Sequence, residues 1–100
     1  EQACYNTSKA AVHHLTRSLA AEWAPRNVRV NAVAPTYIAT EMTKQAAADT
    51  EVSRHWLGRT ALGRLGEPEE IPSVIPFLAG EASSLMTGAV VSADGGYTCW

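Results

Sequence analysis

The chain has 100 residues, a net charge of -2 at pH 7 and 46% hydrophobic residues, which suits one small globular domain. Acidic and basic residues are mixed, so no basic stripe for nucleic acid or polybasic patch for a membrane is present. The apolar runs are too short to cross a bilayer, and no signal peptide is recognisable. We therefore expect a cytoplasmic protein that binds neither nucleic acid nor membrane.

The first predicted element is a helix from Cys4 to Trp23. Pro25 ends it, because the residue before a proline avoids the α-helical region. Apolar residues recur along it at three- and four-residue spacing, which predicts a buried stripe; they are Val12, Leu15, Leu19 and Trp23.

Residues Val28 to Ala34 predict a strand that Pro35 ends. The strand is nearly all apolar, which is typical of a parallel strand covered on both faces.

The segment Thr36 to Gly66 is a long excursion between elements, and such connections are usually functional lids or disordered. Within it, Glu41 to Asp49 predicts a helix with Thr40 as its cap. Glu51 to Leu57 predicts a further turn or two of helix, ending near Gly58.

Residues Glu67 to Ala79 predict another helix, with Pro68 well placed at its start. Pro72 and Pro76 each remove a backbone donor, so we expect this helix to be kinked or broken. Ala89 to Ala93 predict a second short strand, which the turn Asp94-Gly95-Gly96 follows.

The order helix, strand, lid, helix, strand predicts an α/β parallel sheet with a strand–crossover–strand unit. Two parallel strands leave open edges and little core, and such sheets are marginal alone. We therefore expect the fold to be incomplete, with something missing beside the first strand.

Tyr5 and Lys9 lie four residues apart on the first predicted helix, which places them on one face. A positive charge about 4 Å from a phenol stabilises the phenolate by about 4 kcal/mol at an effective dielectric near 20. Such a pair can exchange a proton near neutral pH, where a general acid/base works best. The alternative from the residues alone is a core aromatic beside a solvated helix charge.

The cysteines and histidines, which often bind metals, do not occur at the spacings typical of a metal site. Cys4 and Cys99 form no CxxC motif, and His13, His14 and His55 form no metal pattern. We predict two reduced cysteines and no metal site.

Five motifs in order together resemble the C-terminal part of the classical short-chain dehydrogenase/reductase family. They are Tyr5-Asn6-Thr7-Ser8-Lys9-Ala10, Arg29-Val30-Asn31-Ala32-Val33-Ala34-Pro35, Thr40-Glu41-Met42, Gly63-Arg64-Leu65-Gly66-Glu67-Pro68-Glu69-Glu70-Ile71 and Thr87-Gly88 through Asp94-Gly95-Gly96. The resemblance implies that residues 1–100 are the C-terminal part of one Rossmann-type doubly wound parallel sheet. It also implies that residues 36–66 are the lid and that the N-terminal cofactor-binding part is absent.

The same resemblance implies an oxidoreductase that moves hydride between NAD or NADP and an alcohol or carbonyl carbon. Tyr5 would be the general acid/base, and Lys9 would activate it and hydrogen-bond the nicotinamide ribose. The backbone at Ile38 would meet the carboxamide, and Thr40 would supply a hydroxyl nearby. The cofactor-facing end of the strand would include Pro35 and Thr36.

Two departures from the family pattern are visible. Thr36 stands where the family usually has glycine, which puts the local turn geometry in doubt. The glycine-rich dinucleotide loop, the residue that selects between NAD and NADP, and the catalytic serine match nothing here. We therefore expect a fragment or an incomplete sequence, inactive as the literal 100-residue chain.

The substrate is predicted from weaker similarities to members that act on sugars and polyols, so a polyol, sugar or ketose is expected. Tyr37, Met42 and Trp56 would shape its pocket, although Trp56 and Trp100 can equally serve packing or subunit contact. The tail, Tyr97 to Trp100, suggests a homo-oligomer, commonly a tetramer in this family. Alternatives are a 3-oxoacyl thioester reductase, a non-catalytic binding or assembly module, and an autonomous structural domain.

Overall fold

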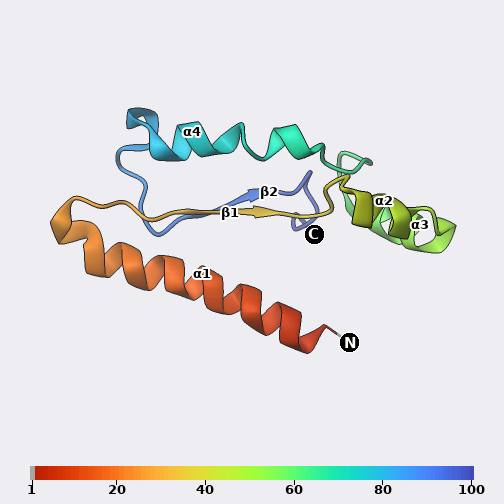
Figure 1. The fold of residues 1–100 in the computed structure, drawn as a ribbon, viewed down its shortest axis with the longest axis horizontal. Helices are drawn as coiled ribbons and strands as arrows, with labels where there is room; N and C mark the ends of the chain where they lie inside the picture. The colour runs from red at the N-terminus through yellow and green to blue at the C-terminus, as the bar shows by residue number, and fades with distance from the viewer. Residues whose placement is uncertain (1) are drawn as a thin grey trace. The chain divides into compact units, whose positions relative to one another are not determined.

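The computed structural model describes residues 2–100 (Figure 1). Its longer elements in chain order are α1 (Ala3–Trp23), β1 (Ala32–Pro35), α2 (Glu41–Ala47), α3 (Thr50–Arg59), α4 (Val74–Ala79) and β2 (Val90–Ala93). Short 3-10 turns accompany them: η1 (Ala24–Arg26), η2 (Pro68–Glu70) and η3 (Glu81–Ser83). β1 and β2 pair in a two-stranded sheet and run in the same direction, so the predicted parallel α/β arrangement is confirmed.

The predicted extent of the first helix is confirmed, but its predicted buried stripe is wrong in part. Val12 and Leu15 are 51% and 54% exposed, whereas the buried residues of α1 are Thr16 and Ala20. A small residue fits there because Gly88 approaches closely: a Cβ on Gly88 would lie 3.4 Å from the Cβ of Ala20. No part of residues 2–100 covers Val12 and Leu15 enough to bury them.

The first strand is shorter than predicted, because β1 begins at Ala32 and not at Val28. In the preceding residues one backbone bond, from the Gly88 N–H to the Val30 carbonyl at 2.7 Å, is supplemented by side-chain hydrogen bonds. The Val30 N–H donates to Thr87 Oγ1 at 3.1 Å. Asn31 donates from Nδ2 to the Met86 carbonyl at 2.9 Å and accepts at Oδ1 from the Ala89 N–H at 3.0 Å. An apolar pattern predicts extended chain but cannot reveal such side-chain hydrogen bonds.

The two predicted helices of the excursion are present, but α2 ends at Ala47, before the predicted end at Asp49. Thr40 is the N-cap of α2, and Thr40 and Thr43 form a capping box. Asp49 caps α3 by accepting at Oδ1 from the Glu51 and Val52 N–H groups at 2.8 and 3.3 Å. α3 continues to Arg59, slightly beyond the predicted end.

The predicted break in the next helix is also confirmed. η2 ends at Glu70 and α4 begins at Val74, with Pro72 between them. Pro76 lies in the first turn of α4, where a helix has no partner for its N–H groups, so its missing donor costs little. β2 starts one residue later than predicted.

The chain divides into two compact units. The first runs to Ala32 and includes Phe77–Val91; the second comprises Val33–Pro76 and Ser92–Trp100. Between residues 2 and 100, only Ala20 and Leu78 are buried hydrophobic residues, which is a small core. No helix in this range is long and apolar enough to span a membrane.

The first unit is organised around one arginine. Arg29 Nη1 donates to the carbonyls of Leu78, Ser83 and Met86 at 2.9, 2.9 and 3.2 Å. Its Nη2 donates to the Gly80 carbonyl at 3.0 Å. One guanidinium thereby fixes the chain that turns from α4 toward β2.

Candidate active site

Tyr5 and Lys9 lie on one face of α1, as their spacing predicts. Lys9 Nζ is 5.4 Å from the centroid of the Tyr5 ring. The Tyr5 side chain is exposed, so a ligand can reach its phenol. The helix holds the tyrosine's backbone in place, and Ser8 Oγ donates to the Tyr5 carbonyl at 2.7 Å. This arrangement places the ammonium of Lys9 over the ring of Tyr5.

The residues that follow β1 belong to the second unit and form a short parallel bridge. Ile38 pairs with Gly66: the Gly66 N–H donates to the Tyr37 carbonyl at 3.0 Å, and the Ala39 N–H donates to the Gly66 carbonyl at 2.8 Å. Backbone groups alternate in direction along extended chain, so the Ile38 N–H points away from Gly66. Within residues 2–100 it donates to no acceptor.

The hydroxyl of Thr40 is engaged locally. Thr40 Oγ1 lies 3.0 Å from Thr43 Oγ1 and accepts from the Thr43 N–H at 3.4 Å. The Thr43 hydroxyl in turn donates to the Ile38 carbonyl. Any cofactor contact of Thr40 would therefore share its hydroxyl with the helix cap, which sequence alone does not reveal.

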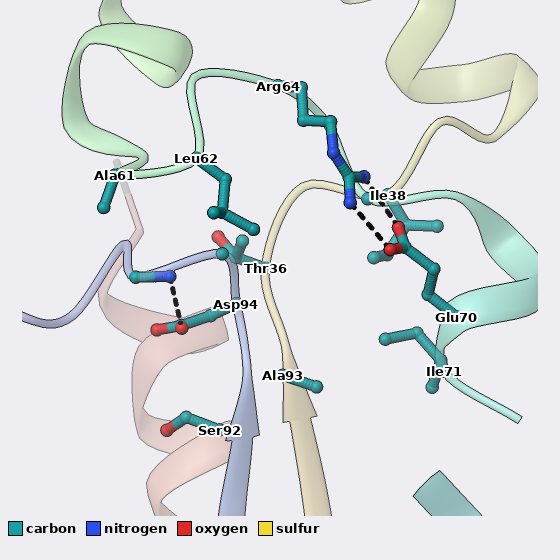
Figure 2. Close-up of a pocket in the computed structure, with 13 residues that line it drawn as sticks. Thr36, Ile38, Ala61, Leu62, Arg64, Glu70, Ile71, Ser92, Ala93 and Asp94 are labelled. Carbon is teal, nitrogen blue, oxygen red and sulfur yellow. Dashed lines mark hydrogen bonds and ion pairs between the residues drawn. The ribbon is translucent and has the colours of Figure 1, made fainter. Parts of the chain in front are cut away.

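A pocket of about 450 Å³ opens in the second unit (Figure 2). Its walls come from four segments: the chain after β1, the loop after α3, the end of η2 with Ile71, and the end of β2 with the turn that follows it. The lining residues are Thr36, Ile38, Ala61, Leu62, Arg64, Gly66, Glu70, Ile71 and Ser92 to Gly96.

The pocket includes only part of the predicted site. Thr36 and Ile38 line it, whereas Pro35, Tyr37, Thr40, Met42 and Trp56 do not. Met42 projects from α2 and is 81% exposed.

An ion pair that sequence reasoning did not single out lines one wall of the pocket. Arg64 donates from Nη1 and Nη2 to the two carboxylate oxygens of Glu70, each at 2.8 Å. Glu70 Oε2 also accepts from the Glu67 N–H at 2.7 Å. The hydrogen bond from Arg64, followed by that backbone bond, lowers the pKa of Glu70 to about 2. The same partner raises the pKa of Arg64.

A second carboxylate, that of Asp94, accepts hydrogen bonds from the turn after β2. Its Oδ2 accepts from Thr98 Oγ1 at 2.6 Å and from the Thr98 N–H at 3.0 Å, and its Oδ1 accepts from the Gly96 N–H at 2.9 Å. The Thr98 hydroxyl is the main cause of a lowered pKa for Asp94. An Asp-Gly-Gly run is the available sequence signal for such a turn.

Two of the predicted substrate-pocket residues are stacked on each other. The rings of Tyr37 and Trp56 have centroids 4.2 Å apart and an interplanar angle of 13°. Elsewhere, no group of three or more His, Cys, Asp or Glu residues in the described part of the chain is placed to hold a metal ion.

The fold and these motifs define an α/β protein of the Rossmann type. A family model described as "Enoyl-(Acyl carrier protein) reductase" matches residues 1–98. The chain belongs to the short-chain dehydrogenase/reductase family, so the resemblance of the sequence motifs is confirmed.

Curated relatives include polyol dehydrogenases. The chain is 60% identical over 99 residues to a galactitol 2-dehydrogenase of Rhizobium johnstonii, covering 99% of this chain and 38% of the relative. It is 56% identical over 96 residues to the L-tagatose-forming galactitol 2-dehydrogenase of Cereibacter sphaeroides, covering 96% and 38%. The chain thus spans little more than a third of the relatives that it matches.

Solved structures share the fold at high similarity. The crystal structure of gox2181 has a TM-score of 0.94 and 54% identity, covering 98% of this chain and 38% of that one. A structure from Agrobacterium tumefaciens with bound NADP has a TM-score of 0.92 and 38% identity, covering 96% and 39%. The NADP bound in the second of these structures agrees with the predicted NAD or NADP cofactor.

Proposed function

We propose that this chain carries the proton-transfer pair of a longer NAD(P)-dependent oxidoreductase that acts on a polyol, sugar or ketose. In this proposal residues 1–100 are the C-terminal part of one Rossmann-type domain. Hydride would pass between the nicotinamide ring and a secondary alcohol or carbonyl carbon. We infer that the whole protein is cytoplasmic and assembles as a homotetramer.

The observation that carries the proposal is the Tyr5–Lys9 pair. The phenol is exposed, and the ammonium lies 5.4 Å from its ring on the same helix face. The helix backbone fixes both attachment points on the same face. A general acid/base in such a position contributes typically 10²- to 10⁴-fold to a rate.

Within the proposed reaction each residue has one task. Tyr5 Oη would give its proton to the carbonyl oxygen during reduction and take a proton from the alcohol during oxidation. Lys9 would stabilise the phenolate that remains and donate to the cofactor's ribose. When bound, the dinucleotide supplies or accepts the hydride.

The open backbone donor at Ile38 supports a place for the nicotinamide carboxamide. Its N–H has no acceptor among residues 2–100, and the bridge to Gly66 fixes the orientation of this N–H. Pro35 and Thr36 would form the adjoining turn, and Thr40 would offer its hydroxyl while capping α2. Tyr37, Met42 and Trp56 remain our candidates for the surroundings of the substrate.

The polyol substrate is supported by the relatives. Both galactitol 2-dehydrogenases are more than half identical to this chain over nearly all of it. Galactitol and related hexitols, with their ketoses in the reverse direction, are therefore the first compounds to test.

The test uses the full-length enzyme with Tyr5→Phe and Lys9→Met, assayed with galactitol and other polyols and with NAD and NADP. Tyr5→Phe removes only the phenolic oxygen, so we expect turnover to fall at least about 10²-fold, while the cofactor dissociation constant changes little. Lys9→Met should lower turnover and also weaken cofactor binding, because it loses the ribose contact. Normal turnover in Tyr5→Phe contradicts the proposed mechanism.

A second candidate is a reductase of 3-oxoacyl thioesters. The description of the matching family model also names an acyl substrate on a carrier protein, although it names the reduction of an enoyl group and not of a carbonyl. The same residues would act, so the substrate decides between the two. Reduction of a 3-oxoacyl thioester at a higher kcat/KM than any ketose would establish this alternative. A non-catalytic binding module, which the threonine at position 36 weakly favours, would show cofactor binding without oxidation or reduction of either class.

A further inference from the structure

Three aromatic rings of the second unit form a connected group, here called the aromatic clamp: Tyr37, Trp56 and Tyr97. Tyr37 stacks on Trp56, and the edge-to-face contact of Tyr37 with Tyr97 has a centroid distance of 5.3 Å and an interplanar angle of 83°. The Arg59 guanidinium lies 5.2 Å from the centroid of the Tyr97 ring. The clamp thus joins the chain after β1, helix α3 and the C-terminal segment.

The same three parts of the chain supply walls of the pocket. Tyr37 lies between the lining residues Thr36 and Ile38. Ala61 and Leu62, also lining residues, follow soon after α3. Gly95 and Gly96 immediately precede Tyr97. The clamp residues are therefore interleaved with the lining residues, and Figure 2 shows Leu62 directed toward Thr36 across the space between two walls.

Further contacts attach the C-terminal segment to the end of α3. The Leu62 N–H donates to the Gly95 carbonyl at 3.0 Å. Trp100 Nε1 donates to the Arg59 carbonyl at 3.0 Å. A Cβ added to Gly96 would come within 2.6 Å of the Ala61 Cβ, so these backbones meet without a gap.

We propose that Tyr97 is a positioning residue, through which the C-terminal segment holds α3 against Tyr37 and fixes the pocket walls for the substrate. The inference rests on the proposed function, because a substrate is what the ordered walls would serve. The three clamp rings contribute through their contacts with one another. In this proposal the C-terminal segment, Tyr97 to Trp100, orders the pocket of its own subunit.

The expected size of the effect follows from the contact of the Tyr97 ring with the Arg59 guanidinium of α3, which Tyr97→Leu removes. A cation–π contact at an exposed site contributes an amount that corresponds to about 2- to 5-fold in an equilibrium constant. Removing the Tyr97 ring should raise the open fraction of α3 by that factor. Apparent substrate affinity falls with the fraction of molecules in the competent arrangement, so KM should rise by up to the same factor while kcat stays within about twofold.

The experiment compares Tyr97→Leu with Tyr97→Phe in the full-length enzyme. Amide hydrogen exchange measures the opening of α3 without substrate, and steady-state kinetics with the polyol measure KM and kcat. Tyr97→Phe keeps the ring and should match the unmodified enzyme. His55→Ala, an exposed change on the same helix, is the matched control and should leave both readouts unchanged. Trp100→Phe, which keeps a smaller aromatic ring and removes the donor to the Arg59 carbonyl, provides a second variant if Tyr97→Leu does not fold, and it should also speed α3 exchange and raise KM.

Faster α3 exchange and a raised KM in Tyr97→Leu, both restored in Tyr97→Phe, support the proposal. Equal exchange in Tyr97→Leu and Tyr97→Phe overturns it, as does a fall in kcat with KM unchanged. Exchange is independent of turnover, which separates the two proposals. If the unmodified enzyme turns over no polyol or ketose, the proposed function fails and, with it, the clamp's role toward the substrate.

Discussion

Arg29 should be the most sensitive structural position in the first unit. Its guanidinium donates to the carbonyls of Leu78, Gly80, Ser83 and Met86 at 2.9 to 3.2 Å. Ser83, one of the four, is 2% exposed, so water cannot readily replace the lost donor there. Arg29→Met keeps most of the aliphatic stem and removes every donor.

The loss can be estimated from these bonds. A hydrogen bond to a charged group contributes about 1.5–3 kcal/mol, and several of the Arg29 bonds share one nitrogen. Counting the two nitrogens as two independent donors gives about 3–6 kcal/mol, a large part of the roughly 5–15 kcal/mol that is typical of a whole domain.

Urea denaturation of the full-length protein measures this loss. Arg26→Met, the same change at an exposed arginine in η1, is the matched control and should cost less than about 0.5 kcal/mol. Arg29→Lys keeps the positive charge but not the planar guanidinium with its several donors, so it should recover only part of the lost free energy of unfolding. A loss below about 1 kcal/mol in Arg29→Met would show that the arginine does not organise this unit.

Two further predictions concern the second unit. Gly96→Ala and Gly63→Ala both place a side chain at positive φ, +83° and +65°; Gly63 has open space, whereas a Cβ at Gly96 meets Ala61 at 2.6 Å. Denaturation should therefore show that Gly63→Ala lowers the free energy of unfolding by about 1–2 kcal/mol, because of backbone strain. Gly96→Ala should lower it by at least about 1 kcal/mol more, because of overpacking. Equal losses in the two variants would contradict the close contact. The folded pKa of Glu70, about 2, lies below the ordinary value of 4.5, so its stabilising contribution is complete above pH 4.5 and declines as the pH falls toward 2. The difference in unfolding free energy between the unmodified protein and Glu70→Gln should shrink over that range, and a pH-independent difference would refute the assignment.

Local rules predicted much of the fold because the responsible residues are near each other in sequence. The threonine at position 40 caps α2 through Thr43, three residues away. Pro72 separates η2 from α4, as its missing donor requires. The face shared by Tyr5 and Lys9 follows from four-residue spacing on a helix.

The failures arise where distant residues decide the structure. Asn31 bonds to residues 55 and 58 positions away, so side-chain hydrogen bonds help to hold the extended chain before β1. Val12 and Leu15 keep their apolar spacing, yet residues 2–100 do not bury them. The stack of Tyr37 on Trp56 and the pairing of Arg64 with Glu70 depend on how a loop residue approaches a residue of α3 or η2, which no period in the sequence encodes.

The central claim is that the hydroxyl of Tyr5 carries the proton in the reaction. The most direct measurement is single-turnover oxidation of galactitol by the full-length enzyme and its Tyr5→Phe variant, with cofactor affinity measured in parallel. We expect the variant to bind the cofactor as before and to transfer hydride at least about 10²-fold more slowly. Equal rates of hydride transfer in the two proteins would contradict the claim.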